Sequence, residues 1–155
     1  MSKIHAFDFE YDHDYTLIGI HSILEDFRLA YFLNKNLKIH LKRNKEDLDF
    51  PSKNCSFPFY VYEDKASFTT WSLISNKYFF IDNVKNLNNN LFQKESKTSY
   101  LVPEKNTVDY FIKINGIINK EKLQNILFKI NETNHILTSY TLDPYNLKSK
   151  ENLIF

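Results

Sequence analysis

The chain has 155 residues, of which 43% are hydrophobic and 25% charged, and its formal net charge is +1. These values predict one compact domain, residues 1–155, and exclude a strong overall attraction to nucleic acid or to anionic membranes. With two glycines and one cysteine, the sequence also excludes the glycine-rich loops of nucleotide-binding sites and an intramolecular disulfide.

The first predicted elements form a strand–helix–strand unit. Residues 15–21 are rich in apolar and β-branched side chains and predict a strand. Ser22, with Glu25 three residues later, matches a capping box and predicts the start of a helix. Apolar residues then recur at helical spacing as far as the polar segment 34–36. A second strand is expected at 37–43, because apolar and basic residues alternate there.

The middle of the chain predicts an antiparallel meander. Three strands, at 57–63, 68–75 and 78–81, are separated by short polar turns. Pro58 has no amide hydrogen to donate, so the first of these strands is expected to be an edge strand or to be bulged. The asparagine-rich segment 82–97 predicts a long loop.

The last third of the chain predicts another strand–helix–strand unit. Strands are expected at 98–102 and 108–115, joined by a tight turn. Asn119 is the predicted N-cap of a helix whose apolar residues fall on one face. A final strand is expected at 136–142, and Pro144 stands near the start of a short terminal helix.

These elements predict an α+β fold in which a mainly antiparallel sheet of six to eight strands carries two main helices on one face. A ferredoxin-like arrangement of β-α-β units is the first topology that the order of elements suggests. The central β-meander has no place in the plain form of that topology, so it would have to be an addition to it.

One short motif stands out between the predicted strands at 98–102 and 108–115. Residues 102–110 read Val-Pro-Glu-Lys-Asn-Thr-Val-Asp-Tyr. This motif resembles the signature of the bacterial IPExxxVDY family, with valine in place of the leading isoleucine. Segments 24–31, 47–50 and 147–155 also resemble recurring blocks of that family. The family has no assigned biochemical activity, so the resemblance implies no catalytic residue.

The signature residues have distinct expected roles. Pro103 and Asn106 suit the turn of a hairpin, and Tyr110 alternates onto the core face of the strand that follows. Glu104 and Asp109 are open to two interpretations. Their carboxylates either accept backbone amide hydrogen bonds that fix the hairpin, which we prefer, or form an acidic pair that contacts a partner.

Metal and catalytic sites are not predicted. Near the start of the chain, acidic residues alternate with aromatic residues and a histidine: Asp8, Glu10, Asp12 and Asp14. A calcium loop would need glycine where His13 stands and glutamate where Gly19 stands. The five histidines are scattered, and Cys55 has no second cysteine beside it. We therefore expect no cofactor, and we interpret the acidic segment as a solvated face.

The segment 35–45 is the most basic part of the sequence. Alternation in the predicted strand at 37–43 places Lys38, His40 and Lys42 on the face opposite its apolar residues, and Arg43 follows in the same basic segment. This face is either an ordinary solvated surface or a surface that contacts RNA phosphates.

The last three residues, Leu-Ile-Phe, are unusual for a chain end, which is normally polar. We expect that Phe155 docks into a groove of its own domain; the alternative is that it anchors another protein.

The leading functional hypothesis is a non-enzymatic, cytoplasmic protein-interaction module. It rests on the absence of a catalytic constellation beside an aromatic content of 16%. The partner is expected to be another protein, bound through an aromatic face of the sheet or through the signature hairpin, and a homo-oligomer is possible. No membrane contact is expected, because no apolar run reaches the ~18 to 20 residues of a membrane helix. The alternative is an RNA- or ribosome-associated accessory protein that uses the basic segment 35–45.

Overall fold

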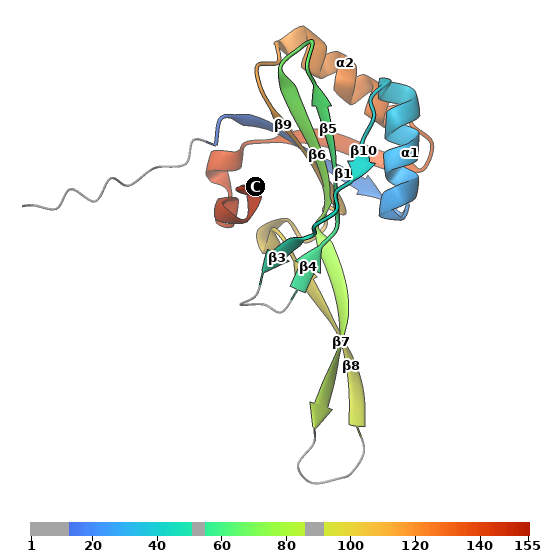
Figure 1. Ribbon diagram of the computed structural model, residues 1–155, viewed down its shortest axis with the longest axis vertical. Coiled ribbons are helices and arrows are strands. Elements are labelled where there is room, and N and C mark those ends of the chain that lie inside the picture. Colours follow the sequence, from blue (N-terminus) through green and yellow to red (C-terminus); the bar gives the residue numbers. More distant parts are fainter. Residues whose placement is uncertain (1–12, 51–54, 86–91) are drawn as a thin grey trace, which may run out of the picture.

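The computed structural model describes residues 13–50, 55–85 and 92–155, and Figure 1 shows how they are arranged. These residues form two α-helices and ten strands in antiparallel sheets, which confirms the predicted α+β fold. The strands are β1 (Tyr15–Ser22), β2 (Lys42–Arg43), β3 (Leu48–Phe50), β4 (Cys55–Phe57), β5 (Phe59–Asp64), β6 (Thr69–Ser75), β7 (Lys77–Lys85), β8 (Phe92–Tyr100), β9 (Tyr110–Asn115) and β10 (Ile136–Leu142). The helices are α1 (Asp26–Leu37) and α2 (Lys120–Asn131), with short 3-10 helices η2 (Pro103–Lys105), η3 (Pro144–Asn146) and η4 (Lys150–Leu153).

The main sheet has six strands in the order β10-β1-β9-β6-β5-β2, and every neighbouring pair is antiparallel. Strands β9 and β10 both pair with β1, so they run parallel to each other and α2 connects them across it. In the same way, β1 and β6 both pair with β9 and so run parallel to each other. The four strands β10, β1, β9 and β6 therefore have the split β-α-β arrangement of a ferredoxin-like sheet. The elements β2–β5 and the hairpin β7–β8 are additions to it.

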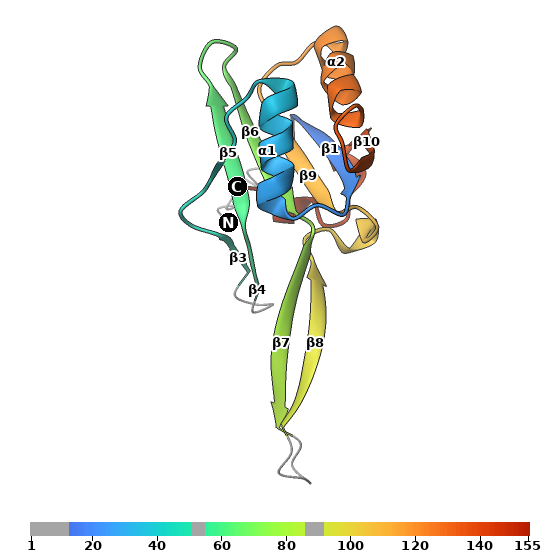
Figure 2. The same ribbon diagram turned by 90° about the vertical axis from the view of Figure 1, so that its right-hand side faces the viewer.

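Both helices pack on one face of this sheet, as predicted (Figure 2). The buried residues of α2 are Ile126 and Ile130, which belong to the predicted apolar face, and Leu29 and Leu33 are buried on α1. They join the side chains that the sheet directs towards the helices in one hydrophobic core. Asn119 caps α2 as expected, because its side chain accepts a hydrogen bond from the amide of Lys122 at 2.7 Å.

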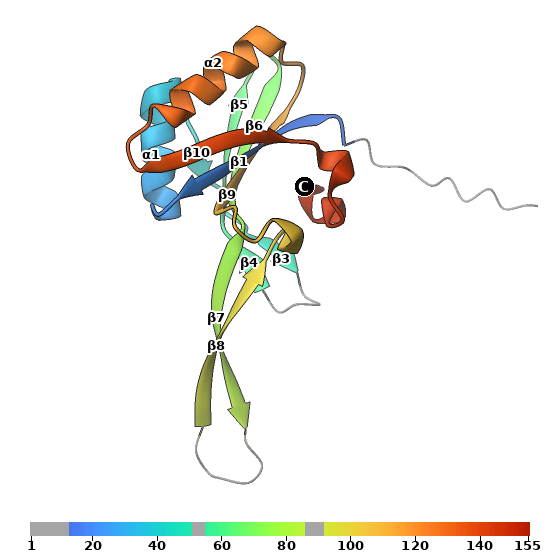
Figure 3. The same cartoon turned by 180° about the vertical axis from the view of Figure 1, so that it is seen from behind.

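The opposite face of the sheet is covered as well. A second core lies there, in which residues of β1 and β9 pack against β4 and against the last segment of the chain, where Leu147 and Leu153 are buried (Figure 3). Strand β9 is therefore buried on both sides: Ile112 faces the helices, and Phe111 faces the second core. Neither face of β9 is free to bind a partner, and an aromatic binding face elsewhere on the sheet stays a prediction.

The start of α1 differs from the prediction. Ser22 ends β1 instead of capping the helix: its hydroxyl donates to the carbonyl of His135 at 2.8 Å and accepts from the amide of Leu24 at 3.2 Å. The helix begins at Asp26, and the cap residue, Glu25, makes no side-chain hydrogen bond to it. Long-range pairing with the segment before β10 thus decides the role of Ser22.

The predicted strand at 37–43 is mostly a loop, and only Lys42–Arg43 pair with β5. Lys38 ends α1 in a left-handed conformation with φ of 54°. The side chain of Asn34 then binds both the amide of Leu41, at 2.7 Å, and its carbonyl, at 3.1 Å. These two hydrogen bonds occupy backbone groups that a sheet would need.

The predicted loop at 82–97 is also wrong where the structure describes it. Strands β7 and β8 form a long antiparallel hairpin that projects away from the main sheet (Figure 1). Because β8 pairs with β7 and not with β9, the signature is not the turn of a β8–β9 hairpin. Residues 103–105 form the 3-10 helix η2 instead. The interval 86–91 lies outside the described residues.

Among the residues that the structure describes, no helix is both long enough and apolar enough to cross a membrane. The acidic positions Asp8, Glu10 and Asp12 fall outside the described ranges.

Candidate functional site

The two signature carboxylates bind other parts of the same chain. Glu104 accepts hydrogen bonds from the amide of Ser149 at 2.7 Å and from its hydroxyl at 2.8 Å. Burial alone would raise the pKa of Glu104, but these hydrogen bonds outweigh it and hold the pKa below its ordinary value. Asp109 accepts from the amide of Ser22 at 2.9 Å and forms an ion pair with Lys77 at 3.0 Å. The expected backbone hydrogen bonds are therefore present, but they join distant segments instead of fixing a hairpin.

Asn76, which the sequence places in an ordinary turn, organises the signature. Its side chain is fully buried and donates to the carbonyls of Lys105, at 2.8 Å, and Val108, at 2.9 Å. It also accepts from the amide of Val102 at 2.8 Å. No sequence pattern indicates this role, because the groups that Asn76 binds lie about 26 to 32 residues further along the chain.

Phe155 docks into its own domain, which was the preferred interpretation of the sequence. Its ring lies 5.7 Å from the ring of Phe59, between ring centroids. The ammonium group of Lys113 lies 4.5 Å from the centre of the Phe155 ring and donates to the carbonyl of Leu153 at 2.6 Å. Lys113 itself is fully buried, and burial lowers its pKa from 10.5 to about 8. Glu104, Asp109 and Phe155 thus all have partners within the domain.

The three basic candidates do not share one strand face. Lys38, Lys42 and Arg43 are exposed, but Arg43 forms an ion pair with Asp47. Lys42 and Arg43 lie in β2, at the edge of the sheet, whereas Lys38 lies at the end of α1. The structure therefore separates Lys38 from the other two and places it beside a pocket.

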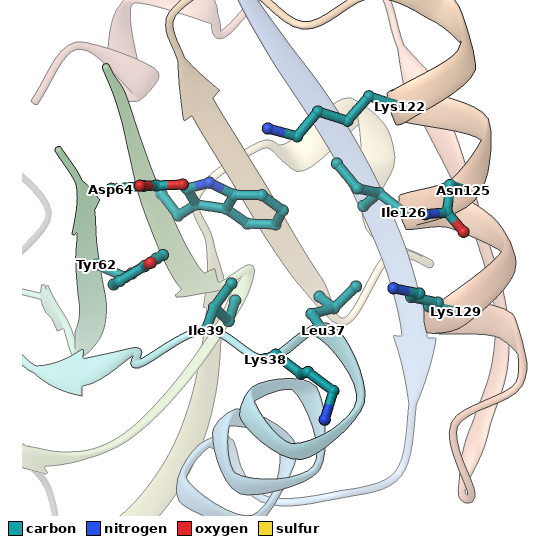
Figure 4. Close-up of a pocket in the computed structure, with 10 residues that line it drawn as sticks. Leu37, Lys38, Ile39, Tyr62, Asp64, Lys122, Asn125, Ile126 and Lys129 are labelled. Carbon is teal, nitrogen blue, oxygen red and sulfur yellow. The ribbon is translucent and has the colours of Figure 1, made fainter. Parts of the chain in front are cut away.

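This pocket has a volume of about 180 Å³ and lies between the end of α1, the strands β5 and β6, and α2 (Figure 4). Three lysines line it: Lys38, Lys122 and Lys129, here called the pocket lysines. Lys122 and Lys129 are two helical turns apart and extend from α2 towards the pocket. Apolar side chains line it as well: Leu37, Ile39, Trp71 and Ile126.

The charge in the pocket is mainly positive. Asp64 is its one acidic residue, and its carboxylate accepts hydrogen bonds from the hydroxyl of Ser67 at 2.7 Å and from the amide of Ala66 at 3.1 Å. The hydrogen bond from Ser67, with further help from the charge of Lys122, lowers the pKa of Asp64. Asp64 is therefore ionised at neutral pH, but one carboxylate does not balance three ammonium groups. The pocket can attract an anion.

A second exposed feature lies on α1 and just before it. Ile23, Phe27 and Tyr31 follow one another at intervals of four residues and are 86%, 58% and 63% exposed. Phe27 and Tyr31, one turn apart, lie on the same side of α1, and Ile23 precedes the helix; these three residues are here called the α1 stripe. The sequence alone does not reveal the α1 stripe. Apolar residues recur with the same helical period on a buried side and on an exposed side, so their spacing does not tell the two sides apart.

Within the described ranges there is no group of three or more histidine, cysteine or acidic side chains that could hold a metal ion. The pocket contains no serine, cysteine or histidine that could act as a nucleophile. Comparison with models of protein families, with curated proteins and with solved structures finds no match to this chain, so its resemblance to the IPExxxVDY family stays a prediction.

Proposed function

We propose that the protein is a non-enzymatic, cytoplasmic binding module that holds an anionic ligand at the pocket lysines, and that this ligand is RNA. The observation that carries the proposal is that lysines from the end of α1 and from α2 line one pocket. Lysine binds phosphate as a point charge and can do so without reading a base. Lys42 is also exposed, at the edge of the sheet, and a polyanion that extends beyond the pocket can contact such a separate charge, whereas a small ion cannot.

The test is a pair of charge-reversal variants. Changing the three pocket lysines to glutamate is expected to weaken binding of a fluorescent single-stranded RNA at least tenfold, measured by anisotropy. The slope of log affinity against log salt concentration should also become shallower, by about 0.7 for each phosphate that the protein no longer neutralises. The control changes Lys97, Lys148 and Lys150, which do not line the pocket, to glutamate. If RNA affinity decreased equally in both variants, the decrease would come from the change in net charge alone, and the proposal would be wrong.

The α1 stripe supports a second candidate function, the binding of a protein partner. Single exposed apolar residues are ordinary, but two exposed aromatic residues on one side of α1 form a patch of the kind found at protein interfaces. The partner can be a different protein or a second copy of the chain.

This second candidate predicts that the double variant Phe27→Ser/Tyr31→Ser abolishes the interaction. Sedimentation of the purified protein would reveal a second copy, and cross-linking in native lysate would reveal another protein. The matched control is Phe128→Ser/Tyr145→Ser, because both of these aromatic residues are also exposed but lie elsewhere. A purified protein that stays monomeric, with no cross-linked species that depends on the stripe, would rule out this candidate.

A further inference from the structure

The pocket has an apolar floor beneath its charged side chains. Ile39, Trp71 and Ile126 line it with the small part of their surface that stays exposed, and the half-buried ring of Tyr62 lines it as well. The indole of Trp71 is held in place, because its N–H donates to the hydroxyl of Thr69 at 3.3 Å. A ligand that carries only negative charge would leave this floor unused. The pocket therefore suits a ligand with an apolar, flat part next to its charge.

The size of the pocket limits that flat part. Pockets for drug-sized molecules measure roughly 300 to 1,000 Å³, whereas this one measures about 180 Å³. It has room for about one ring system. A second hollow of about 320 Å³ shares Lys122 and Asn125 with the first and is also lined by Asn119 and Glu121. A larger ligand can continue there, but the carboxylate of Glu121 disfavours a phosphate, so the phosphates belong beside the pocket lysines.

We propose that the pocket takes one unpaired nucleotide of an RNA strand, with its base on the apolar floor and its phosphates at the pocket lysines. This inference rests on the proposed function and narrows it to single-stranded RNA. A base within a duplex is paired and stacked, so it cannot enter the pocket, whereas an unpaired base can turn out of the strand. Contact between bases and aromatic side chains tolerates any sequence, so we expect little sequence preference.

Trp71 provides a direct readout, because it is the only tryptophan in the chain and it lines the pocket. Its emission is expected to change when a short single-stranded oligoribonucleotide is added. The same RNA annealed into a duplex, inorganic phosphate and a glutamate-rich peptide should leave the emission nearly unchanged. Anisotropy of labelled RNA, measured in parallel, reports binding wherever it occurs on the surface.

A variant that blocks the mouth of the pocket without changing its charge shows how much of the RNA affinity comes from contact with the base. Asn125 is exposed and lines the pocket, so Asn125→Tyr should obstruct it without disturbing the core. We expect single-stranded affinity to fall roughly five- to 150-fold, the contribution of one base–aromatic contact, with duplex affinity unchanged. Gln124→Tyr is the matched control, because Gln124 is the exposed neighbour on α2 and does not line the pocket.

The possible outcomes distinguish the two proposals. Equal affinity for single strand and duplex, with unchanged Trp71 emission, would overturn the single-nucleotide inference, while loss of binding on reversal of the pocket lysines would still support RNA binding. An emission change with the glutamate-rich peptide but not with RNA would overturn both in favour of a protein ligand. Absence of any RNA binding would also overturn both.

Discussion

Asn76→Ala is expected to lower the free energy of unfolding by roughly 4 kcal/mol. The asparagine side chain is fully buried and pairs with three backbone groups around the signature. Alanine would leave the amide of Val102 and the carbonyl of Val108 without this partner, whereas the carbonyl of Lys105 keeps the hydrogen bond from the amide of Val108. Each unpaired buried group costs about 1 to 3 kcal/mol. Chemical denaturation of both proteins measures the difference, provided that the slope against denaturant stays the same.

A second substitution tests whether hydrogen bonding or side-chain volume matters at this position. Asn76→Asp keeps the shape but replaces the amide donor, which faces two carbonyls, with an acceptor. It should therefore destabilise the protein at least as much as alanine does. Asn106→Ala, in the signature segment that Asn76 binds but exposed, is the control and should change stability by less than about 0.5 kcal/mol. A loss below about 1 kcal/mol for both Asn76 variants would contradict the role assigned to Asn76.

Lys113 is expected to make the protein more stable as the pH rises from about 8 to 9.5. Burial lowers the pKa of this ammonium group to about 8, whereas its value in the unfolded chain is 10.5. Between these two values the unfolded state binds more protons than the folded state, so the free energy of unfolding increases with pH. Below pH 8 both states are protonated and this contribution is constant. The gain is at most roughly 1.4 kcal/mol per pH unit.

The comparison with Lys113→Met isolates this contribution. Methionine fills a similar space without a charge, so the variant should show little rise over the same interval of pH. Measurements should stop near pH 9.5, because burial and the nearby charge of Asp26 raise the pKa of Tyr110, which reverses the trend at higher pH. Parallel curves for the two proteins would mean that Lys113 stays protonated in the folded state.

The elements that the sequence predicts correctly are those whose own residues decide their conformation. Asn119 caps α2 with its own side chain, and the spacing that leads to Ile126 and Ile130 marks the buried face of that helix. Strand β9 shows where this reasoning fails. Alternation predicts one buried face, yet Phe111 and Lys113 on the other side are buried too, because the end of the chain packs over them.

The candidate site was only partly accessible to prediction for the same reason. Lys38 is visible in the sequence as part of a basic segment, but its expected strand neighbours lie elsewhere because Asn34 holds the backbone of Leu41. Lys122 and Lys129 look like ordinary solvent-facing residues of an amphipathic helix. Their meeting with Lys38 depends on how α1 and α2 cross the sheet, which no local pattern contains.

The hairpin β7–β8 has a consequence for how the chain folds. Strands β6 and β9 are neighbours in the sheet, where Ser75 pairs with Tyr110, but the whole hairpin separates them along the chain. Bringing the ends of a long flexible segment together costs conformational entropy that grows with its length. A hairpin that closes first would place Asn76 beside Leu101, to whose amide its carbonyl is bonded, and would leave only residues 102–109 to be closed before β9. Early formation of the projecting hairpin β7–β8 would then fix which residues of β6 and β9 pair with each other.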